Sequence, residues 1–512
     1  MNMVYAYKIK PYIQDYVLWA FILIGLIGIT IHACFGYSAQ NAGHAIGNDD
    51  AYITYRYAEN FYKGFGLVFN KGERVEGYSN FLYLILMTPS FFFGRNNVYF
   101  YSLILNSILF SLSIFLFFDL VKNSTDRITA LISSSILSIN PWIWLNVASG
   151  LETTLVFLLF ILILKFIDDF KKIKLLLIFL TLTILSRIDG FVIAFFVCLY
   201  LLANKRYIHF CLSSLFISSV FAIQSLFRYL YYGNFISNTF YAKFYNIDLN
   251  HKISYACFYF FKNLLFTGLW FLFFITAYLS LKRMLKGNFD KIMFYQLFPM
   301  LWVCYIFMIG GDNYNERFLL ILIPCLLYAV CCLSSIKKQV LITTFFLQII
   351  FVPIDERFHY VLNKYDPRIA VGDFIKKHYP NRIIAVDAAG KIPFFSEAKT
   401  IDILGLTDPH ISRKTVKKED AFIPGHIKYD PVYVLNKEPD LIMSWIQENG
   451  DLFWGMTHEK YSKNYFLRYL VNFNKKNRGE KNIIDVKGMH AEDIQILIKD
   501  KYIFAILEKK HP

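Results

Sequence analysis

Long apolar runs separated by short polar loops fill the first two thirds of the chain. A run of roughly 17–25 apolar residues is long enough to cross a bilayer as a helix. By this criterion the pattern predicts about 11 transmembrane helices, near residues 16–35, 98–121, 128–147, 153–168, 174–189, 190–204, 208–227, 264–281, 292–310, 318–336 and 339–354. The predicted fold class is therefore an α-helical polytopic membrane protein.

The apolar run from Phe81 to Phe93 is too short to belong to this set, and it contains Pro89. Its length of about 13 residues favours an interfacial or re-entrant helix. If this run lies parallel to the membrane surface and does not cross it, the short basic loops all fall on one side of the membrane. The positive-inside rule identifies that side as cytoplasmic. An extra crossing would leave only the N-terminus in agreement with that rule.

The same topology collects ionisable residues on the outer, periplasmic face, at the mouths of helices. Such groups are costly to bury near a bilayer and are usually functional. They are Asp49, Asp50, Glu152, Arg187, Asp189, Asp312 and Arg317. We therefore expect the chemistry of this protein on the outer face of a bacterial inner membrane.

From about Asp355 the composition changes to that of a soluble domain. Apolar runs at 382–387, 400–404 and 440–444 predict short strands. We expect a transmembrane catalytic module over 1–354, whose first periplasmic loop with interfacial helices covers 36–97, and a soluble periplasmic α/β domain over 355–512. The sequence contains no Walker A loop and no complete GxGxxG fingerprint.

The composition agrees with a membrane protein, because 56% of the residues are hydrophobic, against roughly 45–50% in soluble domains. The formal net charge of +15 comes mostly from Lys and Arg clusters between apolar spans. A nucleic-acid surface would instead mix cations with stacking aromatic residues on a soluble face. We therefore predict membrane lipid as a partner and no nucleic acid.

The first periplasmic loop carries the densest set of polar residues, beginning at Asp49 and Asp50. Helical spacing stacks Tyr52, Arg56 and Asn60 on one face. A carboxylate at this point can take the proton of an acceptor hydroxyl that attacks an anomeric carbon, and its neighbour can orient the acceptor or bind a metal near a phosphate. The alternative is helix capping, a common role of Asp before a helix.

This stretch, DDAYITYRYAENFYKGFGLVFNKGERVEGYSN, resembles the first periplasmic loop of GT-C glycosyltransferases, and is most similar to bacterial terminal β-(1→2)-arabinofuranosyltransferase-like proteins. Further matching pieces follow in order along nearly the whole chain: SGLET from Ser149, SRIDG from Ser186, YYGNFISNTFYAK from Tyr231, GGD from Gly310, Arg317-Phe-Leu-Leu, DAAG from Asp387 and ILGLTDPH from Ile403. The chain departs from relatives at Tyr78-Ser-Asn, at Ile188 and at Ser237.

The resemblance implies an inverting transfer of a sugar from a polyprenyl-phosphate donor, with Asp49 or Asp50 as the general base. Arabinofuranose is the sugar that it suggests. Cations aimed at a departing phosphate stabilise its growing charge, which makes Arg317, Arg187 and Lys243 candidates for donor binding. The donor-site candidates also include Glu152, Asp312, Arg56 and Tyr52.

Acceptor binding is assigned to residues of the first loop and of the soluble domain, namely Glu76, Tyr78, Asn80 and His410. Each cation and acid has a plain alternative as an interfacial snorkelling side chain or a salt-bridge partner. No cofactor is certain, and the metal ligands are unknown, although Asp49 and Asp50 are compatible with Mg²⁺ or Mn²⁺.

We thus predict a membrane glycosyltransferase that moves a sugar from a polyprenyl phosphate to a cell-envelope glycan or lipid acceptor. The alternatives are a lipid-linked glycan polymerase or ligase, a flippase, and a non-catalytic scaffold that binds lipid-linked sugar. A flippase is disfavoured because no internal repeat is visible, whereas many transporters carry one.

Overall fold

The computed structural model describes residues 16–35, 47–286, 291–313, 315–333, 337–355, 358, 366–416, 422–473, 479–499 and 503–510. The chain divides into two compact units. Unit 1 consists of Met1–His32, Leu103–Val220 and Ala256–Phe358, and unit 2 of Ala33–Ser102, Phe221–Tyr255 and His359–Pro512. The first loop therefore belongs to the same compact unit as the C-terminal part of the chain.

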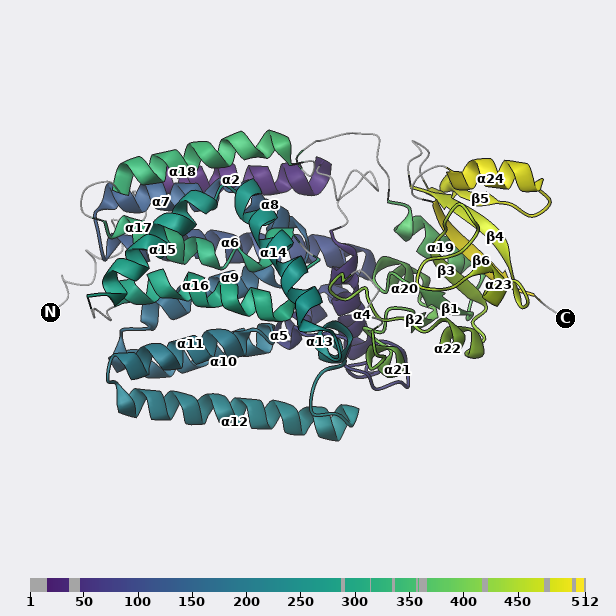
Figure 1. Cartoon of the computed structure of the whole chain (residues 1–512), viewed down its shortest axis with the longest axis horizontal. Coiled ribbons are helices and arrows are strands. Elements are labelled where there is room, and N and C mark those ends of the chain that lie inside the picture. Colours follow the sequence, from purple (N-terminus) through teal and green to yellow (C-terminus); the bar gives the residue numbers. More distant parts are fainter. Residues whose placement is uncertain are drawn as a thin grey trace. The chain divides into compact units, whose positions relative to one another are not determined.

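Unit 1 is helical. The helices that lie wholly or mostly in it are α2 (Tyr16–Phe35), α6 (Val98–Lys122), α7 (Arg127–Ser138), α8 (Pro141–Ala148), α9 (Thr153–Phe166), α10 (Ile173–Ser186), α11 (Gly190–Ala203), α12 (Tyr207–Tyr232), α14 (Leu249–Phe266), α15 (Trp270–Met284), α16 (Lys291–Ile309), α17 (Leu322–Cys331) and α18 (Lys337–Phe351). Short 3₁₀ segments are η3 (Phe170–Lys172), η4 (Asn315–Phe318) and η5 (Val352–Ile354). Helices α10, α11 and α16 run lengthwise beside one another (Figure 1).

By length and composition, five helices in the described part of the chain can cross a membrane, and up to seven if each bent pair is one span. The five are Tyr16–Phe35, Arg95–Lys122, Tyr207–Tyr232, Ile292–Ile309 and Lys337–Ile354. Other predicted spans form shorter apolar helices, such as Thr153–Phe166 and Gly190–Ala203. The protein is a multi-pass membrane protein, and the predicted number of about 11 crossings stays a prediction.

Unit 2 joins a helical part to a sheet. Its helical elements are α4 (Asp49–Tyr62), α5 (Phe81–Met87), η1 (Thr88–Phe93), η2 (Arg95–Asn97), α13 (Asn238–Phe244), α19 (Arg368–His378), α20 (Lys391–Ser396), α21 (Pro409–Ser412), α22 (Pro431–Asn436), α23 (His458–Tyr461), η7 (Gly479–Asn482) and α24 (Ala491–Lys499). The run from Phe81 to Phe93 is a short apolar helix that changes to 3₁₀ geometry at Thr88, just before Pro89. This agrees with a segment too short to be a regular span.

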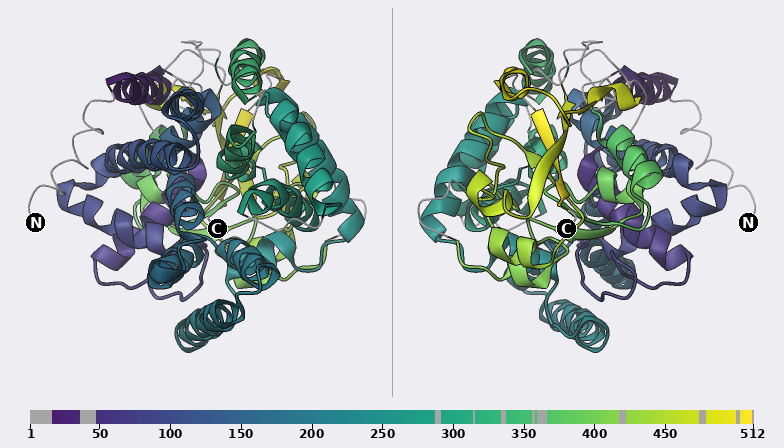
Figure 2. Two further views of the ribbon diagram at one scale, coloured as in Figure 1. Left: turned by 90° about the vertical axis from the view of Figure 1, so that its left-hand side faces the viewer. Right: turned by 90° about the vertical axis from the view of Figure 1, so that its right-hand side faces the viewer.

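The described residues of unit 2 form a six-stranded sheet in the order β2-β1-β3-β6-β4-β5. Its strands are β1 (Ile383–Val386), β2 (Lys399–Asp402), β3 (Leu441–Trp445), β4 (Tyr465–Asn472), β5 (Ile483–Asp485) and β6 (Ile503–Lys509). Strands β2, β1 and β3 pair in parallel, and β6, β4 and β5 continue the sheet in antiparallel pairing. Figure 2 shows β4 and β6 in yellow in its right-hand view.

The two faces of this sheet carry separate hydrophobic cores, because successive strand residues point to opposite faces. One core contains Ala385, Ile442 and Leu507, and the other contains Ile384, Met443 and Ile506 together with Val371 of α19. The α/β organisation predicted for the C-terminal part is confirmed, as are three of its strands, β1, β2 and β3.

Candidate active site

Helix α4 places the first-loop acids of unit 2. Its N-cap is Asn48, whose side-chain oxygen accepts a hydrogen bond from the backbone N–H of Asp50 at 3.0 Å. Asp49 and Asp50 therefore occupy the first turn, where the helix dipole favours negative charge. The capping role considered for these acids belongs to Asn48, which leaves both carboxylates for other contacts.

The carboxylate of Asp49 is held by a turn that follows β1. Asp49 Oδ1 accepts a hydrogen bond from the backbone N–H of Lys391 at 3.0 Å. A Cβ atom at Gly390 would lie 2.0 Å from the Asp49 carbonyl oxygen and 2.6 Å from Oδ2, so only glycine permits this approach. The guanidinium of Arg368 lies 3.9 Å from Oδ1, so a cation also faces this carboxylate.

A buried ion pair stabilises this turn. The ammonium of Lys391 lies 3.0 Å from Asp366 Oδ2, and both side chains are buried. Burial alone would raise the pKa of Asp366, but Arg368 and Lys391 outweigh it and lower the pKa to about 2. The turn that contacts Asp49 is thus fixed by charge as well as by backbone geometry.

The predicted face of α4 forms, but it is turned inward. Arg56 donates to the carbonyl oxygens of Phe69, Pro393 and Ala398 at 2.8, 2.5 and 2.7 Å. Asn60 donates to the Phe69 carbonyl at 3.0 Å, and Tyr52 is buried against aromatic residues of α20. The structure therefore places Arg56 and Tyr52 in contacts that attach α4 to α20.

Three of the four predicted acceptor residues are also buried in unit 2. Glu76 pairs with Arg228 of α12 at 2.9 Å, and burial raises the pKa of Glu76 to about 7 although the guanidinium opposes this shift. The hydroxyl of Tyr78 accepts from Tyr232 at 3.1 Å. Asn80 exchanges hydrogen bonds with the Thr54 hydroxyl.

His410 lies further along the same unit. Its ring is 4.0 Å from the ring of Tyr433, centroid to centroid, and its Nε2 is 2.9 Å from Asp430 Oδ2. Burial acts to raise the pKa of Asp430, but Lys414 and His410 lower it to about 2. His410 is exposed enough for an acceptor to reach it, and its ring is already oriented by two neighbours.

Lys243, the predicted phosphate ligand of unit 2, lies in the last turn of α13. Its side chain passes Gly425, and the buried Lys428 donates to the carbonyls of Tyr241 and Ser412 at 2.7 and 2.6 Å. Burial, with Lys252 and Arg413 nearby, lowers the pKa of Lys428 to about 8. This group of cations suits an anion on electrostatic grounds.

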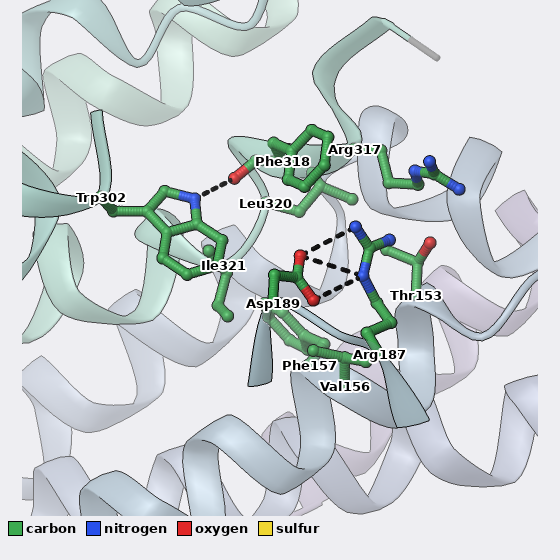
Figure 3. Close-up of a pocket in the computed structure, with 10 residues that line it drawn as sticks. All are labelled: Thr153, Val156, Phe157, Arg187, Asp189, Trp302, Arg317, Phe318, Leu320 and Ile321. Atoms are coloured by element: carbon green, nitrogen blue, oxygen red, sulfur yellow. Dashed lines mark hydrogen bonds and ion pairs between the residues drawn. The ribbon is translucent and has the colours of Figure 1, made fainter. Parts of the chain in front are cut away.

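The remaining candidates lie in unit 1, where the corner between α10 and α11 brings Arg187 to two acids. Arg187 Nε donates to both Asp189 oxygens at 2.9 and 3.1 Å, and Nη1 donates to Glu152 Oε1 at 3.2 Å. Figure 3 shows Arg187 and Asp189 facing each other beside Thr153. The guanidinium also lies 4.8 Å from the centre of the Phe318 ring.

Arg317 extends this cluster from the segment that follows α16. Its Nε donates to Asp312 Oδ2 at 2.7 Å, and its Nη1 lies 3.9 Å from Glu152 Oε1. Gly311 has a φ of +77°, and a Cβ there would approach the Tyr259 ring to 2.9 Å. Glycine is thus required where the chain bends to present Asp312.

The space beside this cluster is small. A cavity of ≈ 20 Å³ is lined by Arg187, Asp189, Arg317, Trp302, Phe318 and others (Figure 3). That volume holds about one water molecule. A phosphate could reach either arginine only if the side chains of the cluster separated, so the structure shows the arginines engaged with carboxylates.

The side chains available as ligands indicate whether the protein could hold a divalent metal ion. The described residues contain no group of three or more His, Cys, Asp or Glu side chains that could hold one ion. Magnesium commonly uses one or two protein carboxylates and completes its coordination shell with water and substrate phosphate. Asp49 and Asp50 would provide at most these two carboxylates. The protein alone does not supply a complete cage in the part that the structure describes.

Several residues that contact the candidate base, or pair with such a residue, were not identified from the sequence as site residues. Gly390, Lys391, Arg368 and Asp366 all lie in the C-terminal part of the chain, more than 300 positions after Asp49. The motif Asp387-Ala-Ala-Gly390 was the available signal, but a backbone N–H donor such as that of Lys391 has no side-chain signature.

The fold and the apolar helices define a class, a multi-pass membrane protein with a C-terminal α/β part. The structure is similar to the crystal structure of the Archaeoglobus fulgidus oligosaccharyltransferase in the apo form, with a TM-score of 0.54 and 11% identity over 90% of this chain and 74% of that one. The crystal structure of the same enzyme in complex with Zn and sulfate gives a TM-score of 0.51 and 12% identity, over 91% and 74%. At this identity the likeness shows the fold, which is the predicted GT-C type.

Two comparisons of the sequence with known proteins identify no function. Residues 357–493 match a family described as a domain of unknown function, DUF8728. No protein of curated function matches the chain. The arabinofuranosyltransferase-like subtype suggested by the sequence motifs stays a prediction.

Proposed function

We propose that this protein is an inverting glycosyltransferase that moves a sugar from a polyprenyl-phosphate donor to a cell-envelope glycan or lipid acceptor, on the outer face of the membrane. Asp49 is the general base. The observation that carries this assignment is the fixed carboxylate of Asp49, held by the Lys391 N–H at 3.0 Å with Arg368 nearby. A base needs this fixed geometry to act on a reacting hydroxyl.

In the proposed step, the acceptor hydroxyl oxygen forms a bond to the anomeric carbon while the bond from that carbon to the phosphate oxygen breaks. The hydroxyl proton passes to Asp49, and polyprenyl phosphate leaves with the bonding electrons. Asp50 assists by orienting the acceptor. Lys243, in the same unit as Asp49, is proposed to stabilise the leaving phosphate, as cations do when charge develops there. Arg187 and Arg317 stay predicted donor ligands.

A second candidate is transfer of a preassembled oligosaccharide from its lipid carrier. The solved structures with the same fold are named oligosaccharyltransferases, which supports this reading. Arabinofuranose as a single transferred sugar is supported by the first-loop motif alone.

Mass spectrometry of the envelope glycan separates these functions. A deletion strain is compared with strains that carry the wild-type chain or Asp49→Asn. Loss of one terminal sugar supports the first candidate, and loss of a whole oligosaccharide supports the second. Either loss should persist with Asp49→Asn, whereas an unchanged glycan in the deletion strain would refute both.

A further inference from the structure

Unit 1 contains a larger cavity at the opposite end of α11 from Arg187. The cavity lies between the last turns of α11 and the first turns of α16, two helices that run side by side (Figure 1). Its volume is ≈ 330 Å³, against ≈ 20 Å³ for the cavity beside Arg187. Helix α11 begins at Gly190 and ends at Ala203, so about 20 Å of helix separates the two cavities.

The lining of this cavity suits a hydrocarbon chain. Asn204 is the one amide in a lining that is otherwise apolar or aromatic, and the lining continues along α11 from Asn204 to Phe196. That distance is about 12 Å along the helix axis. Leu199 and Leu202 of the lining are 38% and 40% exposed, so the cavity is open to the outside. An engineered cavity of about 150 Å³ holds benzene, and this one has room for a longer chain.

Two basic loops of unit 1 meet at one end of the cavity. Asn204 is followed directly by Lys205 and Arg206. The guanidinium of Arg206 lies 4.4 Å from the centre of the Phe170 ring, which joins this loop to η3. Segment η3 adds two further cations, Lys171 and Lys172. We call residues 168–172 and 204–206 the cavity mouth.

The acids of the cavity mouth do not cancel its positive charge. Asp169 pairs with Lys172 at 3.0 Å. Asp168 accepts a hydrogen bond from the hydroxyl of Tyr200, a residue of the cavity lining. Four Lys and Arg residues stand against two Asp residues in the mouth, so a net positive charge begins where the apolar lining ends.

Lys205 occupies a position where the backbone favours glycine. Its φ is +58°, the left-handed conformation in which many helices end and which glycine adopts without steric cost. The backbone N–H of Lys205 donates to the Leu202 carbonyl at 2.9 Å, and that of Arg206 donates to the Leu201 carbonyl at 2.9 Å. The chain therefore keeps a cation at the mouth in spite of a strained backbone, a combination that is concentrated at functional sites.

We propose that this cavity binds an anionic phospholipid of the surrounding membrane, with one acyl chain between α11 and α16 and the phosphate at Lys205 and Arg206. Basic pockets between membrane helices bind anionic lipid headgroups in this manner. The occupant is a phospholipid and not the polyprenyl-phosphate donor, because a predicted donor ligand, Arg187, lies at the other end of α11. The inference does not rest on the proposed function.

The test is native mass spectrometry of the full chain in detergent, titrated with phosphatidylglycerol or with phosphatidylcholine of the same acyl chains. Lys205→Gly removes one cation and suits the local backbone, and Lys205→Gly with Arg206→Gln removes two. Ala203→Phe fills part of the cavity and keeps both cations, because Ala203 belongs to its lining. Lys338→Gln, which removes an exposed cation from α18, is the matched control.

We expect the wild-type chain to bind phosphatidylglycerol about 25-fold more tightly than phosphatidylcholine, since each cation near a headgroup contributes about 5-fold. Lys205→Gly should weaken binding of phosphatidylglycerol about 5-fold, and the double variant about 25-fold, without changing the binding of phosphatidylcholine. Ala203→Phe should weaken both lipids about 10-fold or more, because several methylene groups lose their apolar contacts. Lys338→Gln should bind as the wild type does.

Equal binding of the two lipids by the wild-type chain would overturn the site, as would binding that the double variant leaves unchanged. If Ala203→Phe does not fold, the charge variants decide alone. Displacement of phosphatidylglycerol by glycerol phosphate at a similar concentration would show that the cavity holds no acyl chain. Displacement by polyprenyl phosphate at a lower concentration than by phosphatidylglycerol itself would assign the cavity to the donor and contradict the proposal.

Discussion

The two charged regions of this protein are held in different ways. In unit 1, Arg187 and Arg317 are held by acids, since Asp189, Glu152 and Asp312 occupy their donors. In unit 2, Asp49 is held mainly by the backbone, through the Lys391 N–H and the close approach of Gly390. Ion pairs fix the charged region of unit 1, whereas backbone contacts fix the charged region of unit 2. Substitutions in the two regions should therefore have different effects.

The largest effect on stability is expected at Arg187. Removing it leaves Glu152 and Asp189 buried without their main counter-charge, which costs about 3–5 kcal/mol for a buried pair. We expect Arg187→Ala to lower the free energy of unfolding by that amount, measured by chemical denaturation in detergent. Arg187→Lys keeps the charge and should lose much less; equal stability of the two variants would show that the charge does not hold this cluster.

The second largest effect is expected on activity, at Gly390. A methyl group there would lie 2.0 Å from the Asp49 carbonyl oxygen and must displace the acidic turn of α4. A displacement of about 1 Å can reduce a rate about 100-fold. We expect Gly390→Ala to lower the rate of sugar transfer by about that factor while Ala388→Ser in the same turn does not; a fully active Gly390→Ala would remove the positioning argument.

Acid should weaken unit 2 through Asp366. Its folded pKa of about 2 lies below the unfolded value of about 3.9, so its stabilising contribution is present above about pH 4 and is lost as the pH falls towards 2. The contribution is about 2–3 kcal/mol. Denaturation from pH 5 to 2 should show this loss in the wild type and not in Asp366→Asn; parallel pH curves would contradict it.

The smallest effect is expected at an exposed pair that also joins the first loop to the sheet. Lys399 Nζ lies 2.7 Å from Glu73, and both side chains are about half exposed. Exposed pairs contribute only about 0–1 kcal/mol. Lys399→Ala should therefore leave stability and transfer nearly unchanged, and a loss comparable to that of Arg187→Ala would mean that surface charge joins the first loop to the sheet.

The sequence predicted much of the fold because the signals are local. Apolar runs with β-branched residues predicted β1, β2 and β3, and helical spacing predicted the face shared by Arg56 and Asn60. The later strands, including β4 (Tyr465–Asn472) and β6 (Ile503–Lys509), were not identified.

The site was harder to predict for a physical reason. The sequence indicated Asp49, Asp50 and the arginines, but it gave no sign that Arg56 would donate to the carbonyls of Pro393 and Ala398. Every residue carries such a carbonyl, so the acceptor leaves no mark in the sequence. The domain boundary predicted at about Asp355 stays a prediction, and the first loop and the C-terminal part form one compact unit.

Because the sequence assigns acceptor binding partly to the soluble domain, truncation at about Asp355 would be expected to affect acceptor use more than donor hydrolysis. The structure changes this expectation, because removing the C-terminal part also removes Gly390 and Lys391 from Asp49. Both reactions should therefore be lost together.

The central claim, that Asp49 is the base of a sugar transfer, is tested most directly by the initial rate. Membranes with equal amounts of wild-type chain or Asp49→Asn receive a radiolabelled polyprenyl-phosphate donor carrying the sugar that the deletion strain lacks. Loss of a general base predicts a rate about 100- to 10,000-fold lower for Asp49→Asn. A rate within about twofold of the wild type, well below the range expected for a lost base, would contradict the account.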